Sequence, residues 1–230
     1  MASFALVSDF DGTITRHDFY TLIAERYMSA DAMAIWDSYR DGKITHFEAM
    51  QSFFSNAPED ERSLEDLLRD VQPDPALSEC AEALTRADWD LIIVSAGSSW
   101  YIDLLLQRAN VQAVVHSNPG RIVPGRGLVL NMPKTSPFYC PDVGVDKSAV
   151  MRHALGKYQR VAFAGDGPPD VAPSLLADHD HRFARGFLAQ ELLRRRERFR
   201  SFDRWREVVN TLLSTDLRRP ETRRRAPASH

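Results

Sequence analysis

The stretch Phe4-Ala5-Leu6-Val7-Ser8-Asp9-Phe10-Asp11-Gly12-Thr13-Ile14-Thr15 decides the fold of this chain. Its first half is an apolar run rich in strand formers, which predicts a buried β-strand. The run ends in two carboxylates one residue apart, Asp9 and Asp11, followed by a glycine and two threonines. Because ligands of open α/β sheets bind at the carboxyl ends of the strands, the sequence predicts a binding site at this point.

Asp9 and Asp11 are expected to need a positive partner. Residues i and i+2 of an extended strand point to the same side, so the two carboxylates repel each other unless a cation or a proton lies between them. Mg²⁺ takes oxygen ligands and leaves room for a substrate phosphate, which makes it a suitable partner. The alternative is a solvated turn with the sequence Asp-Phe-Asp-Gly and no ligand.

The composition excludes several classes of protein. The chain has 230 residues, of which 43% are hydrophobic, enough for one core with a smaller appended unit. The formal net charge of −3 gives no case for nucleic acid or an acidic membrane surface as a partner. Two cysteines, Cys80 and Cys140, form neither a disulfide framework nor a zinc spacing. Without a signal peptide or an apolar span, we expect a reduced, cytoplasmic protein with no membrane contact.

The region after Thr15 changes from a strand pattern to a helix pattern. Apolar residues recur at spacings of three and four from about Phe19 to Ala81, which predicts three or four amphipathic helices. The two prolines of Gln72-Pro73-Asp74-Pro75 indicate a hinge. We therefore predict a core over residues 1–15 and 87–217, an inserted helical cap over residues 16–86, and a disordered basic tail over residues 218–230.

Further apolar runs predict the rest of the core. We expect strands at 91–94, 112–116, 160–164 and 181–184, a hairpin over 120–132, and helices at 77–86, 100–109, 146–156 and 190–200. The irregular loop over residues 133–144 is long enough to suggest a role near the site. The arginine-rich helix over residues 190–200 is expected to face solvent or a protein partner.

Polar residues follow the ends of two of these strands. Ser95-Ala96-Gly97 lies between a strand and a helix, where a hydroxyl and free N–H groups favour an anion, although a simple N-cap would explain one serine. Asp166 and Asp170 follow the strand at 160–164, and Lys147 opens a helix. If the strands are neighbours in one parallel sheet, all of these residues converge.

A phosphate monoester bound at this edge would give each residue a task. Asp9 is the candidate nucleophile that forms an aspartyl phosphate, and Asp11 the general acid that later acts as general base. Mg²⁺ would be held by Asp9, Asp166 and the backbone carbonyl of Asp11, with Asp170 in support through water. Lys147 would neutralise the nucleophile and the phosphate. The phosphate cradle would be completed by Ser95, Ala96 and Gly97.

The same residues resemble a known family. Asp9-Phe10-Asp11-Gly12-Thr13, Ser95-Ala96-Gly97, Lys147 and Gly165-Asp166-Gly167-x-x-Asp170 are similar, in this order, to the four motifs of the haloacid dehalogenase-like phosphohydrolases. The resemblance covers roughly residues 5–183. It implies an α/β fold, with a Rossmann-like parallel sheet core and an inserted all-α helical-bundle cap. The helical cap resembles that of the phosphoserine phosphatase branch.

One subfamily is more similar still. Asp9 to Thr15 resembles the first motif of the methylthiopentenyl-phosphate phosphatases of methionine salvage, which also have an aspartate where Asp18 stands and a loop where residues 133–144 stand. Ala96 replaces a glycine common in that family. We expect His17 and Asp18 to lie on the substrate side of the cap, although His17 also fits an exposed hinge residue.

The resemblance implies a Mg²⁺-dependent phosphatase that acts on a small phosphorylated metabolite, such as a methionine-salvage enol phosphate. Phosphoserine is less expected, because residues 49–54 contain no arginine to hold a substrate carboxylate. Two further alternatives are a phosphotransferase that shares the first half-reaction and a non-catalytic binding protein that retains the fold. Both a monomer and a homodimer fit the sequence.

Overall fold

The computed structural model describes residues 2–28 and 32–216, and its centre is a six-stranded sheet. The strand order is β10-β9-β8-β1-β2-β3, and every neighbouring pair is parallel. The predicted Rossmann-like parallel sheet is therefore confirmed. The strands are β1 (Phe4–Ser8), β2 (Trp89–Ser98), β3 (Val114–Asn118), β8 (Arg160–Gly165), β9 (Arg182–Ala184) and β10 (Arg200–Ser201).

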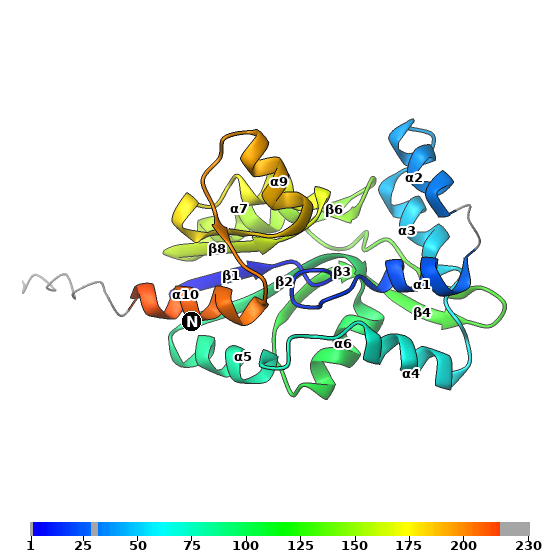
Figure 1. The fold of residues 1–230 in the computed structure, drawn as a ribbon, viewed down its shortest axis with the longest axis horizontal. Helices are drawn as coiled ribbons and strands as arrows, with labels where there is room; N and C mark the ends of the chain where they lie inside the picture. Colours follow the sequence, from blue (N-terminus) through cyan, green and yellow to red (C-terminus); the bar gives the residue numbers. More distant parts are fainter. Residues whose placement is uncertain (1, 29–31, 217–230) are drawn as a thin grey trace, which may run out of the picture.

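Both faces of the sheet are buried, as expected for a parallel sheet with crossover helices. Leu6 of β1 packs into the apolar cluster that includes one set of helices, whereas its neighbours Ala5 and Val7 pack into the other cluster. Figure 1 shows the two helical layers above and below the strands. One layer holds α5 (Leu77–Arg86), α6 (Ser99–Arg108) and α10 (Trp205–Asp216), and the other holds α7 (Lys147–Lys157) and α9 (Gly186–Arg194).

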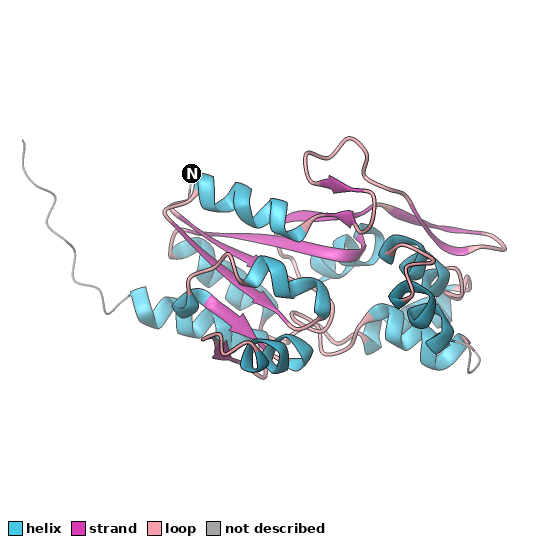
Figure 2. Cartoon of the chain, turned by 90° about the horizontal axis from the view of Figure 1, so that it is seen from above, coloured by secondary structure: helices cyan, strands magenta, loops and turns pink. Residues whose placement is uncertain are grey.

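Four helices follow β1 where three or four were predicted. They are α1 (Phe19–Tyr27), α2 (Ala32–Arg40), α3 (His46–Phe54) and α4 (Glu61–Asp70). In Figures 1 and 2 they gather toward one end of the molecule, opposite the N-terminus. Most of the buried apolar residues of α1, α3 and α4 belong to the same cluster as those of α6, so the cap shares its apolar core with one layer of the sheet domain.

Helix α5 lies with the sheet rather than with the cap helices, since it packs against β2 and α10. The division into core and cap stays a prediction. This packing favours a boundary before Leu77 over the one placed after residue 86. The predicted tail over residues 218–230 lies outside the described residues. Within the described ranges, no helix combines the length and apolar character needed to cross a membrane.

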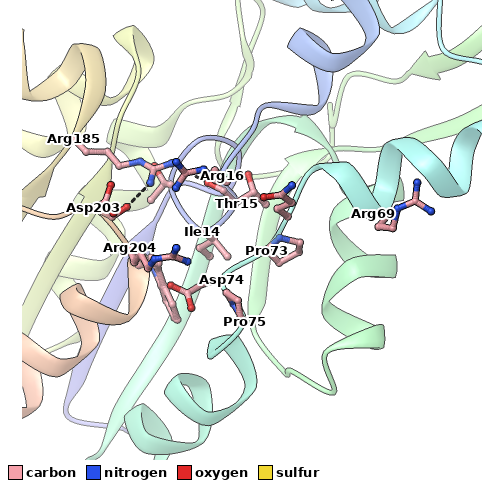
Figure 3. A pocket seen from close by; sticks show the side chains of 13 residues that line it. Ile14, Thr15, Arg16, Arg69, Pro73, Asp74, Pro75, Arg185, Asp203 and Arg204 are labelled. Carbon is pink, nitrogen blue, oxygen red and sulfur yellow. Dashed lines mark hydrogen bonds between the residues drawn. The ribbon is translucent and has the colours of Figure 1, made fainter. Parts of the chain in front are cut away.

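The two linkers between core and cap lie side by side. Thr15 and Pro73 form an antiparallel bridge, and the backbone N–H of Arg16 donates to the carbonyl of Gln72 at 3.0 Å. The guanidinium of Arg185 donates to the carbonyls of Gly12 at 2.5 Å and Thr15 at 3.0 Å. A third bond from Arg185 reaches the carbonyl of Asp203 at 2.7 Å, the dashed line in Figure 3. The loop after β1 is thus tied to the C-terminal part of the core.

The predicted hairpin is confirmed as β4 (Gly120–Val123) paired with β5 (Gly127–Leu130). It is attached to the cap through Gln51 of α3, whose amide donates to the Leu128 carbonyl at 3.2 Å and accepts from the Leu130 N–H at 2.7 Å. The loop that follows contains a short ribbon of β6 (Tyr139–Cys140) and β7 (Gly144–Val145).

Several predicted boundaries differ from the structure, most of all those of α9 and β2. Helix α9 runs from Gly186 to Arg194 instead of 190–200, because Arg196 adopts a left-handed conformation (φ 60°) and the Glu197 N–H closes the helix on the Leu192 carbonyl at 2.9 Å. The strand predicted at 91–94 extends to Ser98, with a register shift against β3 after Val94. Short helical turns at η1 (Pro168–Asp170), α8 (Val171–Ser174) and η2 (His179–His181), and the whole of α10, were not predicted.

Candidate active site

Asp9 follows β1 at the centre of the sheet and is held by its own backbone. Its N–H donates to the Ala164 carbonyl of β8 at 2.9 Å, and its carbonyl accepts from the Ser8 hydroxyl at 2.7 Å. The indole N–H of Trp205 donates in turn to the Ser8 hydroxyl at 3.1 Å. Asp9 is a buried residue, only 7% exposed, so its carboxylate is largely shielded from solvent.

Lys147 is the buried cation of this site. It opens α7 behind the N-cap Asp146, and its ammonium lies 2.8 Å from Oδ1 of Asp9 and 2.7 Å from Oδ1 of Asp170. Burial acts to lower the pKa of Lys147, but the carboxylates of Asp170 and Asp9 outweigh it and hold this pKa above its usual range. Lys147 is therefore protonated at neutral pH.

Three carboxylates gather around this lysine. Oxygens of Asp9, Asp166 and Asp170 lie within 4.8 Å of one another. Burial and the Asp170 carboxylate raise the pKa of Asp9 well above its usual range, and the same two causes raise that of Asp166 to about 6. One ammonium does not balance three carboxylates, so this cluster has the charge and the hard oxygen donors that fit a divalent cation.

Asp170 has fewer oxygens to offer than the other two. Its Oδ1 accepts from Lys147, and its Oδ2 accepts from the N–H groups of Asp166 and Gly167, both at 3.0 Å. Asp166 accepts a bond from the Thr13 hydroxyl at Oδ1, at 2.8 Å. Among the described donors, none occupies Oδ2 of Asp9 or Oδ2 of Asp166. These two oxygens are the ones that could face a metal or a substrate.

Asp11 is not part of the three-carboxylate cluster and has partners of its own. Its Oδ1 accepts from the N–H of Phe19 at 3.1 Å, and its Oδ2 accepts from the hydroxyls of Tyr101 at 2.5 Å and Ser95 at 3.3 Å. Burial raises the pKa of Asp11, and the bond from Tyr101 opposes this rise. Two carboxylates two residues apart thus have separate partners, which allows them separate roles.

The Ser95-Ala96-Gly97 segment lies at the end of β2, next to Asp11. The Ser95 hydroxyl accepts from the Gly97 N–H at 2.9 Å, and the Ala96 carbonyl accepts from the Asn118 amide at 2.9 Å. The N-cap of α6 is Ser98, whose hydroxyl accepts from the Trp100 N–H at 3.3 Å. Ser95 is therefore not that N-cap, and its hydroxyl joins the acidic site instead.

The two residues predicted on the cap side differ in their surroundings. His17 is exposed and pairs through its N–H with the Val71 carbonyl at 3.2 Å, within the linker ribbon. Asp18 precedes α1 and makes no side-chain cap bond. Burial raises the pKa of Asp18 to about 7, and the carboxylates of Asp11 and Asp166 add to this effect. Asp18 thus lies within electrostatic range of the acidic site, whereas His17 is exposed to solvent.

His46 was missed by the sequence reasoning. It is buried on α3, and its Nδ1 has no hydrogen-bond partner within the described ranges. Burial lowers its pKa to about 4, with a further contribution from the positive charge of Lys147. The backbone N–H of His46 donates to Oδ1 of Asp142 in the irregular loop at 3.3 Å, and the backbone N–H of Phe47 donates to the Asp142 carbonyl at 2.8 Å. The signal available in the sequence was the capping box of Thr45 and Glu48, which places His46 in the first turn.

Comparison with known proteins agrees with the geometry. The chain matches the family model described as Putative Phosphatase over residues 4–211. It is 30% identical over 185 residues to the pyridoxal phosphate phosphatase PHOSPHO2 of Mus musculus, covering 73% of this chain and 76% of that protein. It is 23% identical over 189 residues to the 2-hydroxy-3-keto-5-methylthiopentenyl-1-phosphate phosphatase of Brevibacillus brevis, covering 81% and 84%.

Solved structures show the same fold. A phospho-aspartyl intermediate analogue of phosphoserine phosphatase superposes with a TM-score of 0.64 at 14% identity, covering 91% of this chain and 99% of that one. A substrate-bound phosphoserine phosphatase complex gives 0.63 at 13% identity, covering 90% and 96%. The resemblance stated from the four motifs is confirmed. The chain belongs to the Putative Phosphatase family of haloacid dehalogenase-like enzymes and is a phosphoric monoester hydrolase.

Proposed function

We propose that this phosphatase requires Mg²⁺ and hydrolyses a small phosphorylated metabolite through an aspartyl phosphate on Asp9. The observation that carries the proposal is the cluster of Asp9, Asp166 and Asp170, in which one ammonium pairs with Asp9 and Asp170. Lys147 occupies Oδ1 of Asp9, which leaves Oδ2 as the attacking oxygen. A carboxylate nucleophile divides one hard hydrolysis into two easier displacements.

Asp11 serves both half-reactions. In the first, Oδ2 of Asp9 attacks phosphorus while the bond to the leaving oxygen breaks, and Asp11 gives its proton to that oxygen. In the second, Asp11 takes a proton from water, which attacks the same phosphorus and breaks its bond to Asp9. The separate partners of the two aspartates support this division, since Asp9 bonds to Lys147 and Asp11 to Tyr101 and Ser95.

Mg²⁺ would be held by the carboxylates of Asp9 and Asp166 and by the main-chain carbonyl of Asp11, and Asp170 would contact it through water. When bound, the ion supplies positive charge that offsets the repulsion between the nucleophile and the phosphate oxygens. Lys147 stays charged and, 2.8 Å from Oδ1 of Asp9, offsets part of the same repulsion.

The surroundings of the site favour a substrate without a carboxylate. No lysine or arginine is buried in the described part of the cap, where the buried polar group of α3 is the neutral imidazole of His46. Asp18 adds a carboxylate within electrostatic range of the site. A zwitterion such as phosphoserine would bring a second carboxylate to this region without a partner. An enol phosphate of the kind named for the Brevibacillus relative meets no such obstacle.

Asp9→Asn tests the nucleophile. We expect p-nitrophenyl phosphate turnover that disappears in EDTA and returns with MgCl₂, and a loss of more than about 1000-fold in Asp9→Asn, since the reaction then lacks its attacking oxygen. The matched control is Asp178→Asn, because Asp178, His179 and Asp180 form a second, exposed acidic group that could geometrically hold a metal. Full activity in Asp9→Asn, or turnover in EDTA, would contradict the proposal.

Gly12→Ala and Gly42→Ala separate backbone strain from damage to the site. Both glycines have left-handed φ angles, +68° and +69°, so each alanine is expected to cost about 1 kcal/mol of stability. A Cβ at Gly12 would lie 2.4 Å from Oδ2 of Asp166, whereas one at Gly42 would meet nothing within 4 Å. We expect only Gly12→Ala to reduce Mg²⁺-dependent turnover, by at least about tenfold. Equal activity of the two variants would argue against a role for Asp166.

Asp166→Asn is expected to stabilise the metal-free protein. The pKa of Asp166, about 6 in the folded protein against 3.8 as the reference, means that its ionisation opposes folding at neutral pH. For the wild type in EDTA, Asp166 therefore does not oppose folding below its reference pKa of 3.8, where it is protonated in both states, and stability is lost as the pH rises through about 6. Asparagine can keep the bond from Thr13 without the charge, so we expect a gain of about 1 kcal/mol in urea unfolding. The stabilisation that MgCl₂ gives the wild type should vanish in this variant, and its retention would contradict the metal assignment.

A substrate panel tests the specificity argument. We expect the kcat/KM for 2-hydroxy-3-keto-5-methylthiopentenyl-1-phosphate to exceed that for phosphoserine by at least about 100-fold, since an unpaired buried carboxylate costs a few kcal/mol. Pyridoxal phosphate, which the name of the mouse relative gives as a substrate, is included to show which of the two relatives this enzyme resembles in its substrate preference. A preference for phosphoserine would overturn the substrate proposal while leaving the phosphatase mechanism intact.

A further inference from the structure

Tyr101 connects the cap to Asp11 and was not among the predicted site residues. It lies in the first turn of α6 and is 0% exposed. Its ring stacks on that of Phe19, the first residue of α1, with centroids 4.3 Å apart and an interplanar angle of 16°. Its hydroxyl donates to Oδ2 of Asp11 at 2.5 Å. One side chain thus contacts both the cap and the candidate acid and base.

The orientation of Asp11 depends on three donors from three elements. The Phe19 N–H comes from α1, the Ser95 hydroxyl from β2 and the Tyr101 hydroxyl from α6. At 2.5 Å the bond from Tyr101 is the shortest of the three, against 3.1 Å for Phe19 and 3.3 Å for Ser95. A short bond to a carboxylate is among the stronger hydrogen bonds in proteins, so Tyr101 contributes most to holding this side chain.

Gly97 makes room for the Tyr101 hydroxyl. A Cβ built on Gly97 would lie 1.9 Å from the Tyr101 hydroxyl oxygen and 2.9 Å from Oδ2 of Asp11. Any side chain at this position would displace the hydroxyl from its bond. Gly97, in the segment after Ser95, is therefore part of the arrangement that brings Tyr101 to Asp11.

We propose that Tyr101 is a positioning residue that holds the carboxyl group of Asp11 where it can protonate the leaving oxygen. This inference rests on the proposed phosphatase function. In the reaction Asp11 gives its proton to the leaving oxygen as the phosphorus–oxygen bond breaks, and Tyr101 keeps its own proton throughout. A leaving group of low basicity departs readily without a proton, so its cleavage depends little on protonation by Asp11. An alkoxide is strongly basic, so its departure depends on that protonation.

Tyr101→Phe tests the inference, because it keeps the ring that stacks on Phe19 and removes only the hydroxyl. The measurement is kcat/KM in MgCl₂ for p-nitrophenyl phosphate, which has a good leaving group, and for β-glycerol phosphate, which has an alkoxide leaving group. The value of kcat/KM reports only steps up to cleavage of the ester, so later hydrolysis of the aspartyl phosphate does not enter. We expect a loss of roughly 10- to 100-fold for β-glycerol phosphate and less than about threefold for p-nitrophenyl phosphate.

Tyr158→Phe is the matched control. The Tyr158 hydroxyl donates to Oδ2 of Asp90 at 2.7 Å, which is also a tyrosine–carboxylate bond, and neither residue is part of the proposed site. We expect both kcat/KM values to stay at the wild-type level in this variant. Equal losses for the two esters in Tyr101→Phe would show a merely structural role, and no loss for either would exclude any role; each result overturns the inference.

Gly97→Ala provides a second variant should Tyr101→Phe fold poorly. It retains Tyr101 but forces its hydroxyl away from Asp11, and its Cβ would also lie 2.9 Å from Oδ2 of Asp11, inside the predicted phosphate cradle. We therefore expect both kcat/KM values to fall, with a loss at least about tenfold greater for β-glycerol phosphate. A loss shared equally between the two esters would count against the inference. Failure of the proposed function itself has a different signature, namely wild-type turnover without Mg²⁺ or an active Asp9→Asn variant.

Discussion

The arrangement of the site depends on one buried ammonium, whose single positive charge does not balance the three carboxylates around it. Lys147 pairs with Asp9 and Asp170, and Asp166 lies within reach of both. Burial in a region of low dielectric strengthens both the attractions and the repulsions, so the excess negative charge is costly without a further cation. The raised pKa values of Asp9 and Asp166 are the expression of this cost. A fold that retains such a cluster gives up stability for a function, which is a common feature of enzyme active sites.

The parallel sheet keeps the cluster together against its own repulsion. β1 lies between β2 and β8, so the residues after these strands meet at one edge. The backbone bond from Asp9 to Ala164 and the bond of Asp170 to the N–H groups of Asp166 and Gly167 fix the carboxylates to the framework. Removing the lysine would leave these charges buried and unpaired, which costs more than the pair contributes when intact.

The cap meets the core at several points that surround the acidic edge. Gln51 bonds to the hairpin, Asp142 of the irregular loop bonds to the first turn of α3, and Phe19 stacks on Tyr101. The cap also holds an uncharged imidazole, His46, and a carboxylate, Asp18, within electrostatic range of the charged groups of the site. In the proposed mechanism the reacting groups come from the strand ends of the core, and the cap would supply the groups that distinguish one phosphate ester from another.

The sequence by itself determined the fold class and which strands are followed by the candidate catalytic and metal-binding residues. Polar residues after apolar runs pointed to Asp9, Asp11, Ser95 and Asp166, and the start of a predicted helix pointed to Lys147. These signals are local, so they can be read without knowledge of packing. Only the tertiary structure decided that Tyr101 holds Asp11, that His46 is buried beside the charged site and that α9 ends at Arg194. Those features depend on contacts between residues far apart in the chain, or on a backbone reversal at a non-glycine residue. Local periodicity carries no information about either.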